Sequence, residues 1–421
     1  MSIFRRLHIC QSKQINVRQR QIFIMCWIIY TLAYLGRNNL SVAITALETS
    51  LNINKMSVAM LGTLFYWCYA GGKLVSGYFG DYVNNEYLLL GATLVSGLSN
   101  ILMGFVTETW LLMVVWSING FAQSALWCNM IRIISRWFEQ EAQGRLVIWL
   151  STSMIMGSLM AYLGCGLLIQ VLPYQFSFIL PGVLLILAGL VWMLLGGNDA
   201  KSEGFIVGKN ETAIQGPEKP SGSIGTFILS SGLLLITVAC LAQGMVKDSI
   251  GLWGPVMLEE TFNIPAGTSA AMLWMLPLFN FVGIMAIGFL RKHRFKDEPL
   301  AAIFMIASLA CLQVMRMTEN QWVYIISLCM LSALMYGVNI LLLTLYPLRF
   351  VAQGRVSFVS GFLDASAYVA AGLGSMILAS VLDGGHGWSP VYLLWMLMTV
   401  LSLGFLMLIV HLRKRKEPRS R

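Results

Sequence analysis

Long apolar runs alternate with short polar stretches along almost the whole chain. A helix needs about 20 mostly apolar residues to cross a hydrocarbon core of roughly 30 Å. Runs of this kind lie near residues 21–47, 58–80, 87–106, 110–136, 145–170, 177–196, 226–256, 266–290, 299–316, 321–346, 354–382 and 388–412. The pattern therefore predicts an all-α membrane protein with twelve transmembrane helices.

Composition supports this prediction. Of the 421 residues, 57% are hydrophobic and 11% are charged, whereas charged residues make up about 25% of soluble proteins. The net charge of +9 would suggest a nucleic-acid partner in a soluble protein. Here 23 of the 28 Lys and Arg residues lie in the two terminal segments, in alternate loops or at adjoining helix ends. By the positive-inside rule, both termini are expected in the cytoplasm, with lipid rather than nucleic acid around the chain.

A polar stretch rich in Gly, Pro, Ser and charge divides the chain. It predicts a cytoplasmic linker over residues 197–225, between six-helix halves at 1–196 and 226–421. The tripeptide Gln-Gly-Arg recurs at an offset of 210 positions, and the same offset carries Arg37 onto Lys247. These matches indicate two pseudo-symmetric repeats, an architecture of secondary transporters whose substrate site lies between the halves.

Three cations, Arg37, Lys73 and Lys247, lie within the predicted spans. Each costs roughly 2.5–3.5 kcal/mol near the bilayer centre on insertion scales, so such residues usually face a cavity or a partner. On helical spacing, each shares a face with side chains that can bind a polar ligand. These side chains are Tyr34 beside Arg37, Tyr66 and Tyr69 beside Lys73, and Gln243 beside Lys247. The cations are therefore candidates for substrate binding.

Two acids in the spans, Asp248 and Asp364, are candidate counter-charges or coupling groups. Two acids cannot neutralise three cations. Asp248 follows Lys247 directly, so on a helix the two side chains point about 100° apart and are not expected to pair automatically. Asp364 could pair with a cation, bind a proton or contact substrate hydroxyls. The excess positive charge predicts a bound oxyanion, with a divalent one fitting best, and transport by exchange.

Several motifs carry a resemblance to a known family. "YLGRNNLSVA" contains Arg37, "AGGKLVSGYFGD" contains Lys73 and Asp81, and "LWGPVML" follows Lys247. The fourth-span run "WSINGFAQSALWCNMIRIISRWF" includes Trp127 and Arg132. Together these stretches resemble the organophosphate:phosphate antiporter family of the major facilitator superfamily.

The resemblance implies alternating access and exchange of inorganic phosphate for a phosphorylated metabolite. It places Arg37 and Lys247 at the two phosphate-binding cations and Lys73 at a lysine of the second helix. Asp81 matches the aspartate of the gating loop, to which Arg132 is also a candidate contributor. Trp127 and Arg132 either line the path or have a gating or packing role at the cytoplasmic side. Lys247 stands where the family usually has arginine, which keeps the charge and loses the bidentate geometry.

Two other functions are compatible with the sequence. "GRNNLSVA" also resembles the first helix of organic-anion symporters. A proton-coupled symporter of an organic carboxylate, such as a sugar acid, would use Asp364 as its proton site. A transporter-like membrane sensor of a phosphorylated metabolite would keep the fold without flux. No nucleophile–base motif, metal spacing or cofactor motif occurs, so neither an enzyme nor a metal or cofactor protein is expected. A monomer in a bacterial cytoplasmic (inner) membrane is expected.

Overall fold

The computed structural model describes residues 17–79, 84–195, 227–228, 231–292, 297–353 and 355–416, and within these ranges helices joined by short turns are the only regular secondary structure. The elements before the central gap are α1 (Val17–Leu51), α2 (Lys55–Phe79), α3 (Asn85–Met103), α4 (Thr109–Trp137), α5 (Gln140–Leu159), η1 (Met160–Cys165), α6 (Gly166–Val171) and α7 (Phe176–Leu194). Those after it are α9 (Leu233–Phe262), α10 (Ala266–Met272), α11 (Met275–Lys292), α12 (Asp297–Met317), α13 (Gln321–Asn339), η2 (Ile340–Leu345), η3 (Tyr346–Gln353), α14 (Val356–Asp383) and α15 (Ser389–Lys416).

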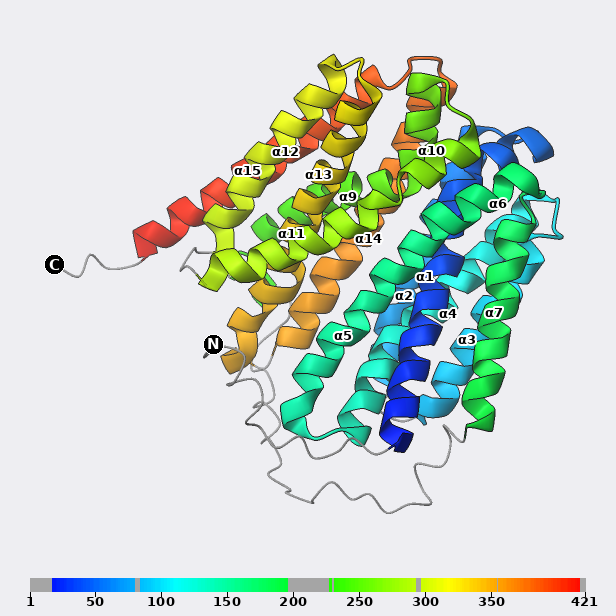
Figure 1. Cartoon of the computed structure of the whole chain (residues 1–421). Coiled ribbons are helices and arrows are strands. Elements are labelled where there is room, and N and C mark those ends of the chain that lie inside the picture. Colours follow the sequence, from blue (N-terminus) through cyan, green and yellow to red (C-terminus); the bar gives the residue numbers. More distant parts are fainter. Residues whose placement is uncertain are drawn as a thin grey trace, which may run out of the picture.

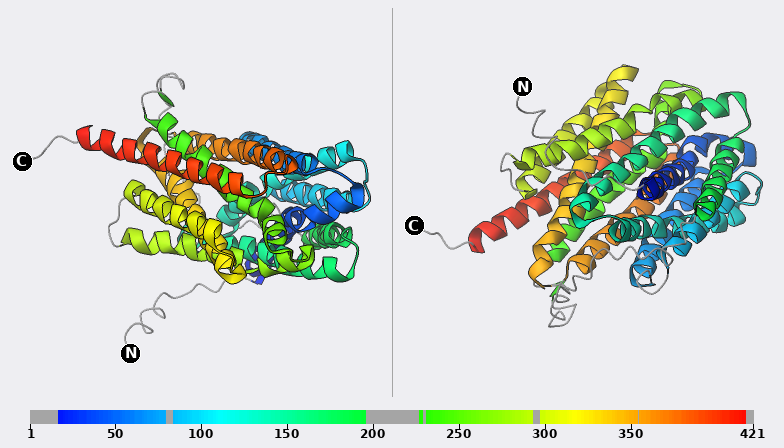
Figure 2. Two further views of the ribbon diagram at one scale, coloured as in Figure 1. Left: turned by 90° about the horizontal axis from the view of Figure 1, so that it is seen from above. Right: turned by 60° about the horizontal axis from the view of Figure 1, so that its bottom comes forward.

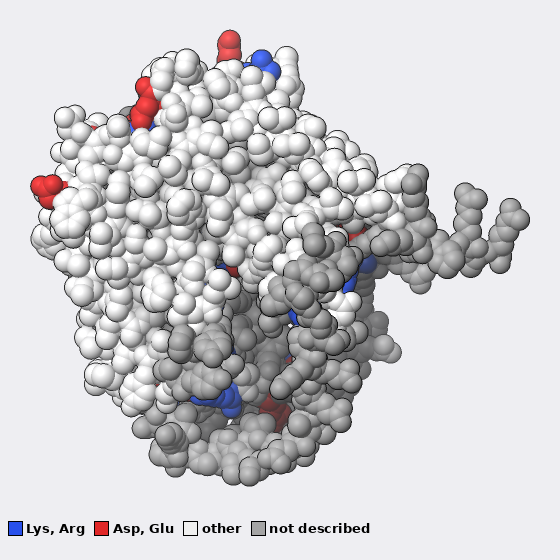
Figure 3. All heavy atoms as spheres, turned by 180° about the vertical axis from the view of Figure 1, so that it is seen from behind, with Lys and Arg blue, Asp and Glu red and all other residues white. Residues whose placement is uncertain are grey.

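Each predicted apolar segment overlaps one of these helices or a run of adjoining ones, with shifted ends, as for α9. Ten helices of the described chain are long and apolar enough to cross a membrane, and α1 and α2 are not among the ten. A largely uncharged surface separates the charged groups at the top of the molecule from those lower down (Figure 3). The expected linker at 197–225 and the loop residue Asp81 lie outside the described residues.

Local sequence explains several helix ends. The side chain of Asn84 accepts hydrogen bonds from the backbone N–H groups of Glu86 and Tyr87, at 2.9 and 3.3 Å, and begins α3. Asn320 caps α13 in the same way. Such side chains satisfy N–H groups that the first helical turn leaves unpaired. At the far end of α9, Asn263 adopts the left-handed conformation with φ 52° and stops the helix.

Helices α1–α7 pack together on one side of the molecule and α9–α15 on the other (Figures 1 and 2). The two groups meet chiefly where α2 packs against α14, with further contacts of α1 with α9 and of α5 with α11. Three segments of the described chain depart from α-helical geometry. η1 and η2 are π-helical turns that interrupt the helices containing α5 and α13, and η3 is a 3₁₀ helix. Such π-helical turns occur frequently at functional sites.

Buried amides of α4 hold α1 in place. Asn119 donates from Nδ2 to the carbonyl oxygen of Gly36 at 3.3 Å, and Gln123 donates from Nε2 to that of Ala33 at 3.1 Å. Asn39 on α1 donates to Asn100 Oδ1 on α3 at 2.9 Å. These bonds join α1, α3 and α4 inside an apolar bundle, where an unmade bond would be costly. They fix the rotation of α1 immediately around Arg37.

Candidate anion-binding site

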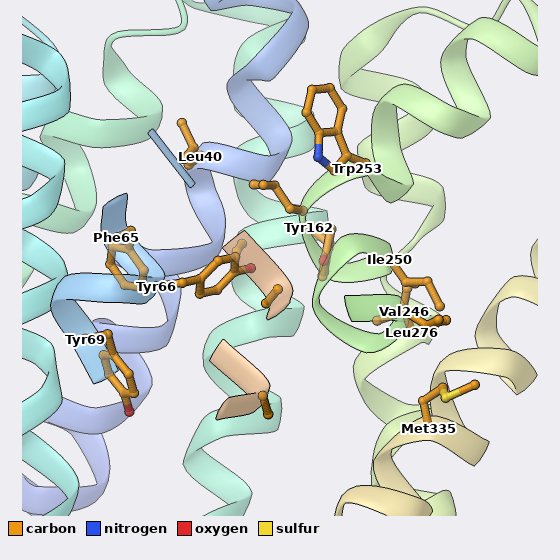
Figure 4. Packing of buried hydrophobic residues seen from close by; sticks show 14 of the residues in the cluster. Leu40, Phe65, Tyr66, Tyr69, Tyr162, Val246, Ile250, Trp253, Leu276 and Met335 are labelled. Atoms are coloured by element: carbon orange, nitrogen blue, oxygen red, sulfur yellow. The ribbon is translucent and has the colours of Figure 1, made fainter. Parts of the chain in front are cut away.

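A cavity of about 160 Å³ lies between the two groups of helices. Its lining comes from α1, α2, α4, α5, η1, α9, α11, α13, η2 and α14. Tyr66 of α2 and Tyr162 of η1 point into the space between α2 and α9 (Figure 4). Both groups of helices thus contribute to one polar chamber in the middle of the bundle.

Arg37 faces this cavity from α1 inside a box of aromatic rings. Its Cζ lies 4.6 Å from the ring centre of Tyr69, 5.2 Å from that of Phe65 and 5.6 Å from that of Tyr34. Tyr368 of α14 completes the box at 5.8 Å. Ring faces attract a guanidinium, by about 0.5–1 kcal/mol at exposed sites and about 2 kcal/mol when water is excluded, and leave its N–H groups available.

No acceptor for Arg37 is found within the described chain, which contains neither an ion pair nor a hydrogen bond of its side chain. A guanidinium carries five N–H donors in a rigid fork. In a cavity lined by aromatic rings, these donors are placed to grip a carboxylate or phosphate group. Arg37 is the strongest candidate for the anion-binding residue.

Lys73, by contrast, has a partner. Its Nζ pairs with the carboxylate of Asp364 on α14, and both side chains remain about a quarter exposed. The same Nζ lies 5.0 Å from the ring centre of Tyr69 and 5.3 Å from that of Tyr368. Lys73 and Arg37 therefore share two rings, and the pair with Asp364 ties α2 to α14 beside Arg37.

Lys247 also has a partner, which corrects the expectation drawn from helical geometry. Its Nζ pairs with the carboxylate of the adjacent Asp248, although the two side chains leave the helix about 100° apart. The long methylene chain of lysine spans that angle, and burial of both groups leaves no water to compete. Tyr336 of α13 adds a ring centre 5.1 Å from Nζ.

The other expected site residues lie at various distances from the chamber. Tyr34 and Tyr66 line it, whereas Tyr69 reaches it only through the aromatic box around Arg37. Gln243 is buried and donates to the carbonyl oxygen of Met335 at 3.0 Å, outside the lining. Trp127 packs against Tyr30, with ring centres 5.2 Å apart. Arg132 donates to the carbonyl oxygen of Ser76 at 3.3 Å, which ties α4 to α2.

Polar residues of α11 and α13 complete the chamber, and sequence reasoning missed them. Asn280 Oδ1 and Ser332 Oγ are buried, line the cavity and have no hydrogen-bond partner within the described chain. Asn339 and Tyr336 line the same wall. A signal existed for Asn280, which is the sole amide in the apolar run of α11. Because buried polar atoms are normally hydrogen-bonded, the missing partners make Asn280 and Ser332 candidates for contact with hydroxyl groups of a ligand.

The chamber is closed at the end of the bundle where α1 and α2 are joined, here called the outer end. Ser41 Oγ donates to the carbonyl oxygens of Gly251 and Leu252, both at 2.8 Å. Farther out, Lys55 Nζ lies 2.6 Å from Glu260 Oε1, and the carboxylate of Asp383 accepts the N–H of Met56 at 3.0 Å. Every one of these contacts joins the α1–α7 group to the α9–α15 group.

Comparison with known proteins agrees with this architecture. The family model described as "Major Facilitator Superfamily" matches residues 26–375. The chain belongs to this superfamily. Accordingly it is an integral, multi-pass membrane protein, and the major facilitator fold expected from the sequence is confirmed at the level of its helical architecture.

Among major facilitator proteins, the chain is similar to the membrane sensor protein UhpC of Escherichia coli K12, at 22% identity over 89% of this chain and 88% of UhpC. It is similar to the hexose-6-phosphate:phosphate antiporter of the same organism at 21% identity, over 95% of this chain and 92% of the antiporter. These relatives confirm the resemblance to the organophosphate:phosphate antiporters. A crystal structure of a bacterial homolog of the human lysosomal transporter Spinster, inward-facing and unoccupied, shares the fold with a TM-score of 0.71, 13% identity, and coverage of 94% and 95% of the two chains.

Proposed function

We propose that this major facilitator protein exchanges an organic phosphate for inorganic phosphate by alternating access. The observation that carries the proposal is Arg37, a cation whose donors face a central chamber and have no acceptor within the described chain. Relatives named for hexose-6-phosphate:phosphate antiport support the same substrate class. The substrate phosphate binds Arg37, and its hydroxyl-bearing part lies against Asn280 and Ser332.

The proposal includes the architecture inferred from the sequence. Helices α1 and α2 join the ten apolar helices to give twelve spans in two six-helix halves, residues 1–196 and 226–421, connected by a cytoplasmic linker. Both termini lie in the cytoplasm, the membrane is the bacterial inner membrane, and the protein works as a monomer without a cofactor. The contacts of Ser41, Lys55 and Asp383 close the outer end, and their opening would admit substrate from that side.

Transport needs the two halves to rock, so contacts across the chamber must break and reform. Exchange follows if the chamber reorients readily only when an anion accompanies Arg37. An unaccompanied guanidinium in a closing, low-dielectric chamber is strongly disfavoured, whereas a bound anion removes that cost. This asymmetry would couple outward movement of one anion to inward movement of another.

Proteoliposomes test the proposal directly. Vesicles preloaded with unlabelled phosphate should take up labelled phosphate without a pH gradient, and empty vesicles should not. A protein that binds phosphate esters but gives no uptake in either case is not an exchanger.

A membrane sensor is the second candidate, because UhpC is among the relatives and aligns over nearly the whole chain. A sensor would show saturable binding of a phosphate ester with no flux in loaded vesicles. The carboxylate symporter receives less support, since Asp364 is engaged with Lys73.

A further inference from the structure

The charges of the chamber do not balance. A charge cluster of five residues surrounds it: the cations Arg37, Lys73 and Lys247, and the carboxylates Asp248 and Asp364. Each lysine is paired with one carboxylate, and within the described chain Arg37 has no ionic partner. With all five groups ionised, the cluster carries one net positive charge.

This single charge decides which anion the chamber can hold without rearrangement. A singly charged anion brings the cluster to neutrality, whereas a doubly charged one leaves an excess negative charge among the rings that surround Arg37. An uncompensated charge is strongly disfavoured in such a low-dielectric setting. Drawing a lysine toward the ligand does not remove the cost, because the carboxylate it leaves becomes unpaired in turn.

We propose that the chamber selects singly charged anions, so that a phosphate monoester binds in its monoprotonated form, with one negative charge. The inference rests on the proposed function and narrows its substrate class. It also revises the divalent oxyanion expected from the sequence, because pairing of Lys247 with Asp248 withdraws one cation from the ligand.

Two isosteric probes test the proposal on the purified protein. Methyl phosphate changes from one to two negative charges as the pH passes its second pKa, which is about 6 for phosphate monoesters. Methyl sulfate keeps one negative charge throughout. Their affinities are measured by competition with labelled inorganic phosphate at a series of pH values from about 5.5 to 7.5. Above the second pKa, the ratio of methyl phosphate to methyl sulfate affinity should fall about tenfold per pH unit.

The ratio separates titration of the ligand from titration of the protein. Ionisable side chains face the charge cluster from six of the elements around it. They are Tyr34 and Arg37 on α1, Tyr66, Tyr69 and Lys73 on α2, Tyr162 on η1, Lys247 and Asp248 on α9, Tyr336 on α13, and Asp364 and Tyr368 on α14. While both probes carry one negative charge, titration of any of these groups acts equally on the two and cancels in the ratio. Protonation of Asp248 or Asp364 would instead raise the net charge to two and favour the dianion, as replacement of either by asparagine does.

Changing the charge count should change the selected species. Asp248→Asn and, independently, Asp364→Asn raise the net charge to two, so each should flatten the pH dependence of the ratio by admitting the dianion. The double variant Lys247→Met with Asp248→Asn restores one net charge. It should recover the tenfold slope whatever its absolute affinity.

The outcomes distinguish failure of this inference from failure of the proposed function. A ratio that stays constant or rises with pH in the unsubstituted protein means that the dianion binds, which overturns the inference and leaves phosphate exchange standing. Absence of competition by inorganic phosphate and by both probes overturns the inference together with the proposed function. The affinity ratio of the unsubstituted protein tests the inference by itself, even if a variant does not fold.

Discussion

Lys73 and Asp364, 291 positions apart in the sequence, form an ion pair that joins α2 to α14 beside Arg37. The pair crosses between the two groups of helices at the chamber itself. Removing one member leaves the other as an unpaired charge in a partly buried site, which costs more than the pair contributes. This relationship can be measured as a coupling between the two residues.

We expect Lys73→Met and Asp364→Asn each to lower thermal stability, and the double variant to be more stable than the sum of the two losses predicts. Coupling energies of contacting residues are about 0.5–3 kcal/mol. Thermal denaturation of the unsubstituted protein, the two single variants and the double variant, all purified in detergent, gives the four stabilities to be compared. Additive losses would mean that the two side chains do not interact.

Arg37→Ala should lower phosphate exchange by at least about 100-fold, because charge-assisted hydrogen bonds contribute about 1.5–3 kcal/mol each and two are lost. Arg37→Lys keeps the charge but not the fork, so it should recover only part of the rate. Initial rates in phosphate-loaded proteoliposomes measure both. Arg316→Ala, an exposed cation at the end of α12, is the matched control and should exchange normally. Near-normal exchange by Arg37→Ala would remove Arg37 from the site.

Much of this site could be predicted from the sequence, because charged residues in apolar segments are conspicuous. Arg37, Lys73, Lys247, Asp248 and Asp364 all lie at or beside the chamber. Pairing was harder to predict: an adjacent lysine and aspartate meet only because the lysine bends back, and burial decides whether it does. The helical segments could also be predicted from apolar runs alone, whereas their insertion as twelve spans and the division into halves stay predictions.

Other features depend on tertiary packing, which a hydropathy pattern does not contain. The π-turns η1 and η2 arise where a helix accommodates one extra residue, and nothing in their apolar sequences distinguishes them from α-helix. Similarly, Asn280, Ser332 and Tyr368 come from three helices distant in sequence, and only folding brings them to one chamber. The sequence shows that these residues are polar, but it does not show that they meet around one chamber.

The outer end should open more readily when its ion pair is removed. Lys55→Met eliminates the contact with Glu260, whereas Lys55→Arg retains it and serves as the control. We expect labelling of a Ser41→Cys variant by a membrane-impermeant maleimide added outside to be several-fold faster with Lys55→Met than with Lys55→Arg. The same labelling of chains that carry Ser41 gives the background from native cysteines. Equal rates in the two Lys55 variants would show that the pair does not hold the outer end closed.

Asn280 and Ser332 should distinguish an organic phosphate from inorganic phosphate. Their unpartnered oxygens lie on the wall formed by α11 and α13, where we expect them to accept hydrogen bonds from the sugar hydroxyls that inorganic phosphate lacks. Each such bond contributes about 0.5–1.5 kcal/mol. Asn280→Ala and Ser332→Ala should therefore raise the KM for a hexose phosphate about 2- to 12-fold. The KM for inorganic phosphate should stay unchanged.

Ser308→Ala, at a buried serine that donates a hydrogen bond to the carbonyl oxygen of Phe304 within α12, controls for loss of a buried hydroxyl. A parallel rise in both KM values would mean that the substitutions distort the chamber, and the assignment of Asn280 and Ser332 to the hydroxyl-bearing part of the substrate would be wrong.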